Sequence, residues 1–336
     1  MYRRMFRNGL DITVNQTLLH RRVTRRIRSL PARWASRFIN ISMVEDRLFA
    51  AYEQAKSRYK AKLPKLPALD SEIVAGLERD GVFITSLDAL GLPGSDEMFA
   101  SGRKLADVYG ERSARGGLRN QYTVQADADE VMRHSAIFRW GLNERLLRIA
   151  ESYLGLPVGY DGINIFYTVA DGRQSGARRW HRDIEDRRML KAAVYFNDVD
   201  MDGGPLEILH RRFPGDDAMS SSGYPVLTQE ALETKLGAPL DGGDVTTCVG
   251  PAGTVIFSDL ATHYHRGRPA VSRDRCAVFY NYISHRPLRP FFCERSVLSR
   301  GQVAELVADL SPDQRACALW RDRLPRLARL VPPAPL

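Results

Sequence analysis

The sequence predicts a mainly β core with flanking helices. The second half of the chain contains short runs rich in β-branched and aromatic residues, and Gly, Pro, Asp and Asn separate these runs. This alternation of strand and turn signals is typical of a β-sandwich or barrel. Residues 128–154 and the end of the chain instead carry helical patterns. A length of 336 residues suits one large domain or two small ones.

A Pro-rich break divides the chain near its start. The segment Leu-Pro-Lys-Leu-Pro at 63–67 follows a helical pattern over 43–62 and precedes another. We therefore expect three parts. Residues 1–65 form a basic amphipathic helical extension, residues 66–295 form the β-rich domain, and residues 296–336 form a helical tail.

Local signals place the elements of the domain in order. A helix over 71–79 is closed by Gly81, and a strand follows at 82–85. Ser311 and Pro312 provide the cap and first turn of a C-terminal helix. The remaining expected elements are helices over 95–110, 128–154 and 228–236 and strands at 163–169, 190–196, 206–209, 253–258 and 276–283.

The basic charge of the chain belongs to its first forty residues. The whole chain has a net charge of +9, and residues 1–40 hold ten arginines with a single acid, Asp11. The remainder is therefore neutral. Pro31 is expected to kink a helix in this segment or to begin a second one. Apolar residues recur there at close to helical spacing: Val14, Leu18, Val23, Ile27, Leu30, Trp34 and Phe38.

Four interpretations of this basic segment are open. A helix with an Arg-rich face and an apolar face can lie in a membrane interface, which would give residues 1–40 a peripheral membrane contact. The same helix can instead dock its apolar face on the protein's own core. A cleaved organelle presequence is also Arg-rich and acid-poor. Nucleic-acid binding is the least favoured, because no aromatic interleaving or known motif accompanies the charge.

Composition limits the cellular setting. No run of about 18 apolar residues is present to span a membrane, and no continuous apolar signal peptide precedes the domain. The four cysteines, Cys248, Cys276, Cys293 and Cys317, lack the short paired spacing of a zinc knuckle or disulfide framework. We expect reduced thiols in a cytoplasmic protein, with attachment to the inner membrane surface as the alternative location.

His181, Asp183 and the distant His265 are the candidate metal ligands. Residues two apart on a strand point to the same side, so the side chains of His181 and Asp183 can share one site. Two histidines and one carboxylate occupy one face of the octahedral Fe(II) in non-heme oxygenases and leave the opposite face open. A lone His-x-Asp is a weak signal, so its sequence context decides.

That context resembles the phytanoyl-CoA dioxygenase family of iron- and 2-oxoglutarate-dependent oxygenases, over roughly residues 70–290. The matching pieces are Trp180-His181-Arg182-Asp183, Gly203-Gly204-Pro205-Leu206, Gly253-Thr254-Val255-Ile256-Phe257, His265-Arg266-Gly267-Arg268-Pro269 and Arg275. The resemblance implies a double-stranded β-helix, or jelly-roll, cupin-like core with the metal near one mouth of the barrel.

The resemblance also implies the cofactors. Fe(II) would bind to His181, Asp183 and His265, with 2-oxoglutarate and O2 as co-substrates. Arg275 would hold the distal carboxylate of 2-oxoglutarate, since a guanidinium can form two parallel hydrogen bonds to it. Tyr167 and Tyr195 are further candidates for contacting 2-oxoglutarate or the substrate. Halogenating relatives lack the carboxylate ligand, so the implied reaction here is hydroxylation, with desaturation, epimerisation or ring closure as variants.

Several points stay open at the level of sequence. His263 has the same strand parity as His265, and only the family string favours His265. Arg273 shares the parity of Arg275 and is the second candidate cation. The substrate is expected to be a small molecule or a lipid-linked compound. The alternative functions are a catalytically silent jelly-roll module that the basic segment recruits to an anionic surface, and a cupin-like metal isomerase that needs no 2-oxoglutarate.

Overall fold

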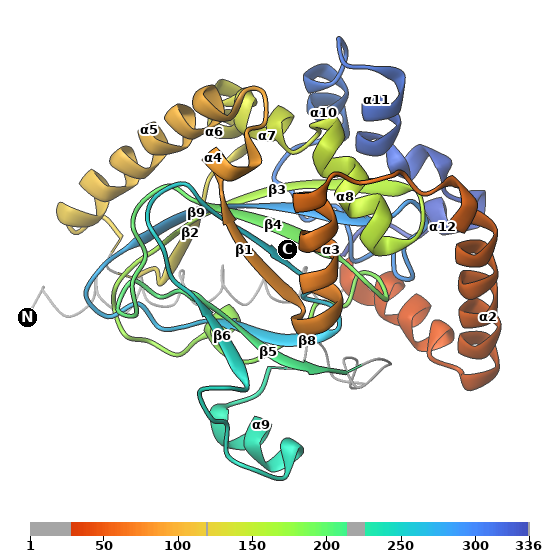
Figure 1. The fold of residues 1–336 in the computed structure, drawn as a ribbon, viewed down its shortest axis with the longest axis horizontal. Helices are drawn as coiled ribbons and strands as arrows, with labels where there is room; N and C mark the ends of the chain where they lie inside the picture. The colour runs from red at the N-terminus through yellow and green to blue at the C-terminus, as the bar shows by residue number, and fades with distance from the viewer. Residues whose placement is uncertain (1–27, 119, 214–225, 335–336) are drawn as a thin grey trace, which may run out of the picture.

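Two antiparallel sheets form the core of the protein. The computed structural model describes residues 28–118, 120–213 and 226–334 (Figure 1). The larger sheet has the strand order β1-β7-β4-β9-β3-β2 and the smaller sheet the order β6-β5-β8. The strands are β1 Val82–Ser86, β2 Thr123–Gln125, β3 Val158–Thr168, β4 Leu190–Tyr195, β5 Leu206–Arg212, β6 Val245–Cys248, β7 Thr254–Ser258, β8 His263–Gly267 and β9 Arg275–Ser284. The predicted mainly β, double-stranded β-helix core is confirmed.

Helices flank this core on several sides (Figure 1). Residues 28–39 are helical, and the labelled helices begin after them. They are α2 Ser42–Tyr59, α3 Ala68–Asp80, α4 Leu87–Leu90, α5 Ser95–Ala114, α6 Ala128–Arg133, α7 Ser135–Trp140, α8 Glu144–Leu154, α9 Gln229–Leu236, α10 Arg300–Leu306, α11 Pro312–Ala318 and α12 Arg326–Leu330. In the described part of the chain, no helix combines the length and apolar character of a membrane span.

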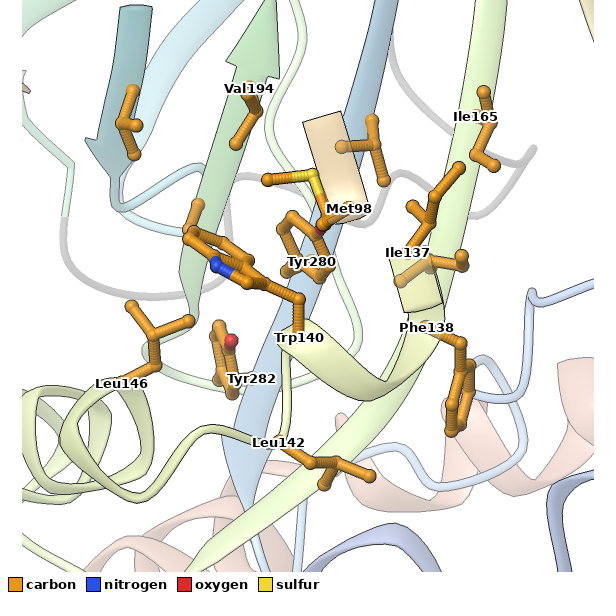
Figure 2. Packing of buried hydrophobic residues seen from close by; sticks show 14 of the residues in the cluster. Met98, Ile137, Phe138, Trp140, Leu142, Leu146, Ile165, Val194, Tyr280 and Tyr282 are labelled. Atoms are coloured by element: carbon orange, nitrogen blue, oxygen red, sulfur yellow. The ribbon is translucent and has the colours of Figure 1, made fainter. Parts of the chain in front are cut away.

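The largest hydrophobic cluster lies between the larger sheet and the helices α3, α5, α7 and α8. Figure 2 shows Trp140 at the end of α7 beside Tyr280 of β9, and the two ring centroids are 5.0 Å apart. Phe138 of α7 meets Tyr160 of β3 edge-on at 5.2 Å. Tyr282 donates a hydrogen bond to the carbonyl of Gly141 at 2.7 Å. These ring contacts and this hydrogen bond orient the buried tyrosines and hold the sheet against the helices that pack on it.

The opposite face of the larger sheet meets the smaller sheet. Side chains alternate along a strand, so Val194 of β4 faces the helices while Ala193 and Tyr195 face inward. Ile208 of β5 and Ile256 of β7 belong to the same inner cluster. This layer is the interior of the β-helix, and the candidate site lies beside it.

The C-terminal residues pack on the same core. Trp320 and Leu324 are buried in a cluster with Met189 and with Ile283 of β9. Ser311 caps α11, as the sequence predicted, and the structure shows in addition a reciprocal capping box with Gln314. The three-part division of the chain stays a prediction.

Candidate metal centre

Backbone hydrogen bonds bring His181 and His265 together. His181 lies in the loop before β4, whereas His265 lies on β8. The N–H of His181 donates to the carbonyl of His265 at 3.0 Å, and the N–H of His265 donates back to the carbonyl of His181 at 2.9 Å. The two imidazole centroids are 4.1 Å apart. The pairing of two distant segments thus places both rings in one site.

Asp183 completes the cluster. Its backbone N–H donates to the carbonyl of Leu260 at 2.7 Å, which holds the segment beside the end of β7. The ligand atoms of His181, Asp183 and His265 all lie within 4.8 Å of one another, and all three side chains are buried. Within the described ranges this is the one group of three or more His, Cys, Asp or Glu residues with such an arrangement.

Hydrogen bonds determine which ring nitrogens face the cluster. The Nδ1 of His181 lies 2.7 Å from the carbonyl oxygen of Arg179, and the Nδ1 of His265 lies 3.3 Å from that of His263. A carbonyl only accepts, so each Nδ1 carries the proton and each Nε2 keeps the lone pair that binds a metal. Burial lowers the pKa of both imidazoles, so both rings are neutral at physiological pH.

A lysine keeps the carboxylate of the cluster ionised. Burial alone would raise the pKa of Asp183, but positive charge beside it, above all that of Lys191, lowers the pKa below its usual range. The Nζ of Lys191 lies 2.6 Å from the Oδ2 of Asp183. The cluster therefore offers two neutral imidazoles and one carboxylate anion, and this donor set fits a divalent iron ion.

His263 belongs to a different environment. Its Nδ1 lies 2.9 Å from the carbonyl oxygen of Leu209, and its ring packs on Gly81, where an added Cβ would lie 2.4 Å from the ring. The pairing of β5 with β8 shifts register between the two histidines of β8, so simple alternation does not apply there. The structure places His265, and not His263, in the cluster.

Arg275 is a buried cation at the start of β9 and lines the same cavity as the cluster. Its Nη1 donates to the carbonyl of Gly204, and its Nη2 lies 3.5 Å from the hydroxyl of Thr168. Among the described residues, no carboxylate forms an ion pair with Arg275. Gly204 has φ +70°, and a Cβ there would lie 2.8 Å from the carbonyl oxygen of Arg268. The Gly-Gly-Pro-Leu turn can therefore pack closely on the backbone at Arg268, and in this position its Gly204 carbonyl accepts from the guanidinium of Arg275.

Arg273, the second candidate cation, lies on the surface. It forms an ion pair with Asp200, and its side chain is 63% exposed. The structure therefore brings Arg275 to the cavity and leaves Arg273 in solvent.

Tyr167 lies on the face of β3 away from the cavity. Its neighbours Phe166 and Thr168 line the cavity, whereas Tyr167 stacks on Tyr109 of α5 at 5.6 Å between centroids. Its hydroxyl donates to Asp274 at 2.7 Å. Strand alternation explains why Tyr167 does not line this cavity, and its contact with 2-oxoglutarate or substrate stays a prediction.

Tyr195 faces the interior but lies behind Arg275 rather than on the wall of the cavity. Its hydroxyl donates to the carbonyl of Cys248 at 2.9 Å and accepts from the N–H of Leu206 at 3.2 Å. Burial raises its pKa to about 12, although the positive charge of Arg275 opposes the shift. Its ring lies 6.0 Å from the Cζ of Arg275. Tyr195 therefore supports the guanidinium by packing.

A cavity of about 240 Å³ opens beside the cluster. The three cluster residues and Arg275 form one part of its wall. Another part comes from residues that the sequence did not single out, namely Tyr122, Thr123, Asn164, Phe166, Lys191 and Phe279. Lys191 carried a usable signal, because a lysine interrupts an otherwise apolar buried strand at 190–196.

No family model and no curated protein matches the chain, so the resemblance to the phytanoyl-CoA dioxygenase family stays a prediction. Solved structures do match. The non-heme alpha ketoglutarate dependent epimerase SnoN from nogalamycin biosynthesis is 17% identical at a TM-score of 0.40, over 66% of this chain and 85% of that chain. EctD from S. alaskensis with 2-oxoglutarate and 5-hydroxyectoine is 19% identical at a TM-score of 0.41, over 65% of this chain and 76% of that one.

HygX from Streptomyces hygroscopicus with nickel and 2-oxoglutarate bound is 14% identical at a TM-score of 0.40, over 66% of this chain and 88% of that chain. Because these identities are low, the activity and substrate of this chain have to be inferred from its own residues. Those residues form a double-stranded β-helix with a buried His-Asp-His cluster and a buried arginine around one cavity.

Proposed function

We propose that the protein is an Fe(II)- and 2-oxoglutarate-dependent dioxygenase that hydroxylates a small-molecule or lipid-linked substrate. One observation carries the proposal. The cluster of His181, Asp183 and His265 shares its cavity with Arg275, a buried guanidinium that no described carboxylate neutralises. A metal site and an anion site in one cavity are what a metal-chelating dicarboxylate requires.

The cluster would hold the metal through the Nε2 atoms of its two histidines and a carboxylate oxygen of Asp183. Bound Fe(II) supplies the redox chemistry that couples O2 to oxidation of a substrate C–H bond and decarboxylation of 2-oxoglutarate to succinate. The protein keeps both imidazoles neutral by burial and fixes their tautomers through backbone carbonyls. Both features prepare the ligands before the ion arrives.

Arg275 would bind the carboxylate of 2-oxoglutarate that is distant from the metal. Its position is fixed by Gly204 and Thr168 and by the ring of Tyr195. A charge-assisted pair in a buried site is strong because little water competes with it. The substrate would occupy the part of the cavity lined by aromatic and polar residues, including Asn164 and Phe279.

The half-reaction can be tested without knowing the substrate. Purified protein is titrated with Fe(II) and 2-oxoglutarate under anaerobic conditions, and visible absorption is recorded. A weak charge-transfer band should appear in the wild type and be lost in His181→Ala. The matched control is His210→Ala, because the Nε2 of His210 lies 2.6 Å from the Thr246 hydroxyl and outside the cluster.

Exposure to O2 should then release succinate slowly without added substrate. A band that survives in His181→Ala would place the metal elsewhere. Metal binding without any 2-oxoglutarate binding would favour a cupin-like metal isomerase. No binding of either would favour the silent binding module.

A further inference from the structure

The helix at residues 28–39 is oriented with its large apolar side chains in solvent. Leu30, Trp34 and Phe38 recur every four residues and therefore form one ridge along the helix. Their exposed fractions are 45%, 65% and 62%. The residues that the helix buries are small, Ala32 and Ser36. A surface helix of a soluble protein normally buries its apolar stripe. This helix has the inverse orientation, because it exposes the ridge of Leu30, Trp34 and Phe38, called here the aromatic ridge.

The helix that carries the aromatic ridge, and the helix α2 that follows it, are held against the body of the protein. At the end of the helix, the Oδ1 of Asn40 accepts a hydrogen bond from Arg289 at 3.1 Å. In the following helix, α2, the ring of Tyr52 lies 5.2 Å from the guanidinium of Arg187, and Tyr59 donates to Glu151 of α8. Figure 1 shows α2 at the edge of the molecule, beside the sheets rather than between them. The ridge therefore belongs to a docked element whose contacts leave its apolar side uncovered.

Positive charge accompanies the aromatic ridge. Arg28, Arg33 and Arg37 lie on the same helix, and no acid occurs between residues 28 and 44. The guanidinium of Arg37 lies 5.4 Å from the centre of the Trp34 ring. An interfacial helix combines these features: aromatic side chains that enter the headgroup region and arginines that meet anionic lipid.

Charge favours an anionic bilayer over two other partners that could cover the ridge, namely the segment 1–27 and a second copy of the helix. The segment 1–27, including Val14, Leu18, Val23 and Ile27, lies outside the described residues, and by sequence it carries seven arginines and one acid. Covering the ridge with that segment, or with the same helix of a second copy, would bring arginines against arginines. An anionic bilayer instead presents the opposite charge to both segments.

We propose that the aromatic ridge of Leu30, Trp34 and Phe38 docks the protein on an anionic phospholipid surface. The protein would lie on the bilayer with these side chains at headgroup depth. The inference is independent of the proposed dioxygenase activity, since none of the three residues lines the cavity of the metal cluster.

The test uses the full-length protein and vesicles of phosphatidylcholine with about 30% phosphatidylglycerol, a charge density comparable to that of anionic leaflets. Co-sedimentation should occur with these vesicles and fall with added salt, and pure phosphatidylcholine should retain much less protein. The double variant Trp34→Ala/Phe38→Ala should weaken binding by about tenfold or more, since binding scales with buried apolar area. The matched control is Leu327→Ala/Leu330→Ala, which removes two exposed leucines of α12.

Tryptophan fluorescence reports the ridge directly. The four tryptophans are Trp34, Trp140, Trp180 and Trp320, and all except Trp34 are at most 4% exposed. A blue shift on addition of anionic vesicles therefore reports burial of Trp34. Thermal unfolding of the double variant, followed by circular dichroism, checks that it is folded.

Three results would overturn the proposal. The first is no binding to anionic vesicles at low salt. The second is binding that the double variant retains in full, which would assign it to the arginines alone. The third is concentration-dependent dimerisation, lost in the double variant, without vesicle binding, which would identify a second copy as the occupant.

Discussion

The metal cluster and the N-terminal helix depart in opposite directions from the usual distribution of side chains. In the cluster, His181, Asp183 and His265 are polar but buried. In the helix, Trp34 and Phe38 are apolar but exposed. Buried polar groups and exposed apolar patches are the two informative exceptions to ordinary burial. The two proposals assign each exception a binding partner of matching chemistry: a cation for the cluster, and an apolar, anionic surface for the helix.

The largest expected effect comes from removing a charge from the cluster. Asp183→Ala should lower the affinity for Fe(II) by more than about 100-fold, because even outer-shell changes at metal sites cost about 10–100-fold. Competition with a chromophoric chelator under anaerobic conditions measures this. Asp200→Ala, which removes a surface carboxylate paired with Arg273, should leave the affinity unchanged. Equal effects from both variants would refute the assignment.

Lys191→Met should destabilise the metal-free protein by about 3–5 kcal/mol, since it leaves a buried carboxylate without its cation. Added Mn(II) should reduce this loss, because the metal then supplies the positive charge beside Asp183. Urea unfolding with and without metal measures both values. The control is Lys56→Met, whose partner Glu53 is 3.7 Å away on the surface and whose loss should cost less than about 1 kcal/mol. A loss that metal does not reduce would argue against Asp183 as a ligand.

Arg275→Met should raise the KM for 2-oxoglutarate by about 100-fold, because a charge-assisted pair of hydrogen bonds is worth about 3 kcal/mol. Succinate release at varied 2-oxoglutarate concentration measures the change. Arg273→Met removes an exposed guanidinium two residues away and should leave KM unchanged. If Arg273→Met had the larger effect, the anion site would have been placed wrongly.

Gly81→Ala tests whether the His263 ring is fixed in its position against Gly81, outside the cluster. Gly81 ends α3 with φ +74°, and its added Cβ would meet the His263 ring at 2.4 Å. We expect a loss of about 3 kcal/mol, from a left-handed backbone and overpacking together. Gly94→Ala has φ +76° and open space around its Cβ, so only the backbone cost of about 1 kcal/mol should appear. If denaturant unfolding gave equal losses of stability for the two variants, the His263 ring would be able to move away from the added Cβ at little cost.

The smallest effect is expected at the aromatic ridge. Trp34→Ala should change the free energy of unfolding by less than about 0.5 kcal/mol, as exposed substitutions usually do. Trp140→Ala, which empties a buried site beside Tyr280, should cost about 3–5 kcal/mol. Both values come from urea unfolding. A large loss at Trp34 would show that the ridge serves the fold rather than a partner.

The regular elements of the domain were largely predictable from sequence. The strands β1, β4, β7 and β9 fall where strand-like runs predicted them, and α9 matches the helix expected over 228–236, with Thr228 as its N-cap. The strands β2 and β6 were missed, and β8 was assumed only in the strand parity of His263 and His265. All three are short and polar, so pairing with neighbours and not composition makes them strands. β3 begins earlier than expected because Gly162, with φ +79°, forms an irregularity within the strand where the sequence indicated a turn.

The candidate site was predictable in its residue types but only partly in its geometry. The cluster, the buried Arg275 and the turn at Gly204 follow from linear motifs. The orientations of Tyr167 and Tyr195 did not, because strand parity fixes a face only once the neighbouring sheet is known. The sequence also left open whether the apolar stripe of the N-terminal helix faces the core or the solvent, since its spacing is the same in both cases. The structure rules out an inward direction for Trp34 and Phe38.

The reciprocal backbone hydrogen bonds between His181 and His265 would link metal binding at the proposed centre to folding. Because the two imidazoles are carried by paired backbone, their spacing is set when β8 joins the sheet. The folded chain therefore pays little conformational entropy when the ion binds, which is the advantage of a preorganised site. The same arrangement makes the ion a ligand of the native state alone, so metal should protect these two segments from local unfolding and slow the exchange of their amide hydrogens.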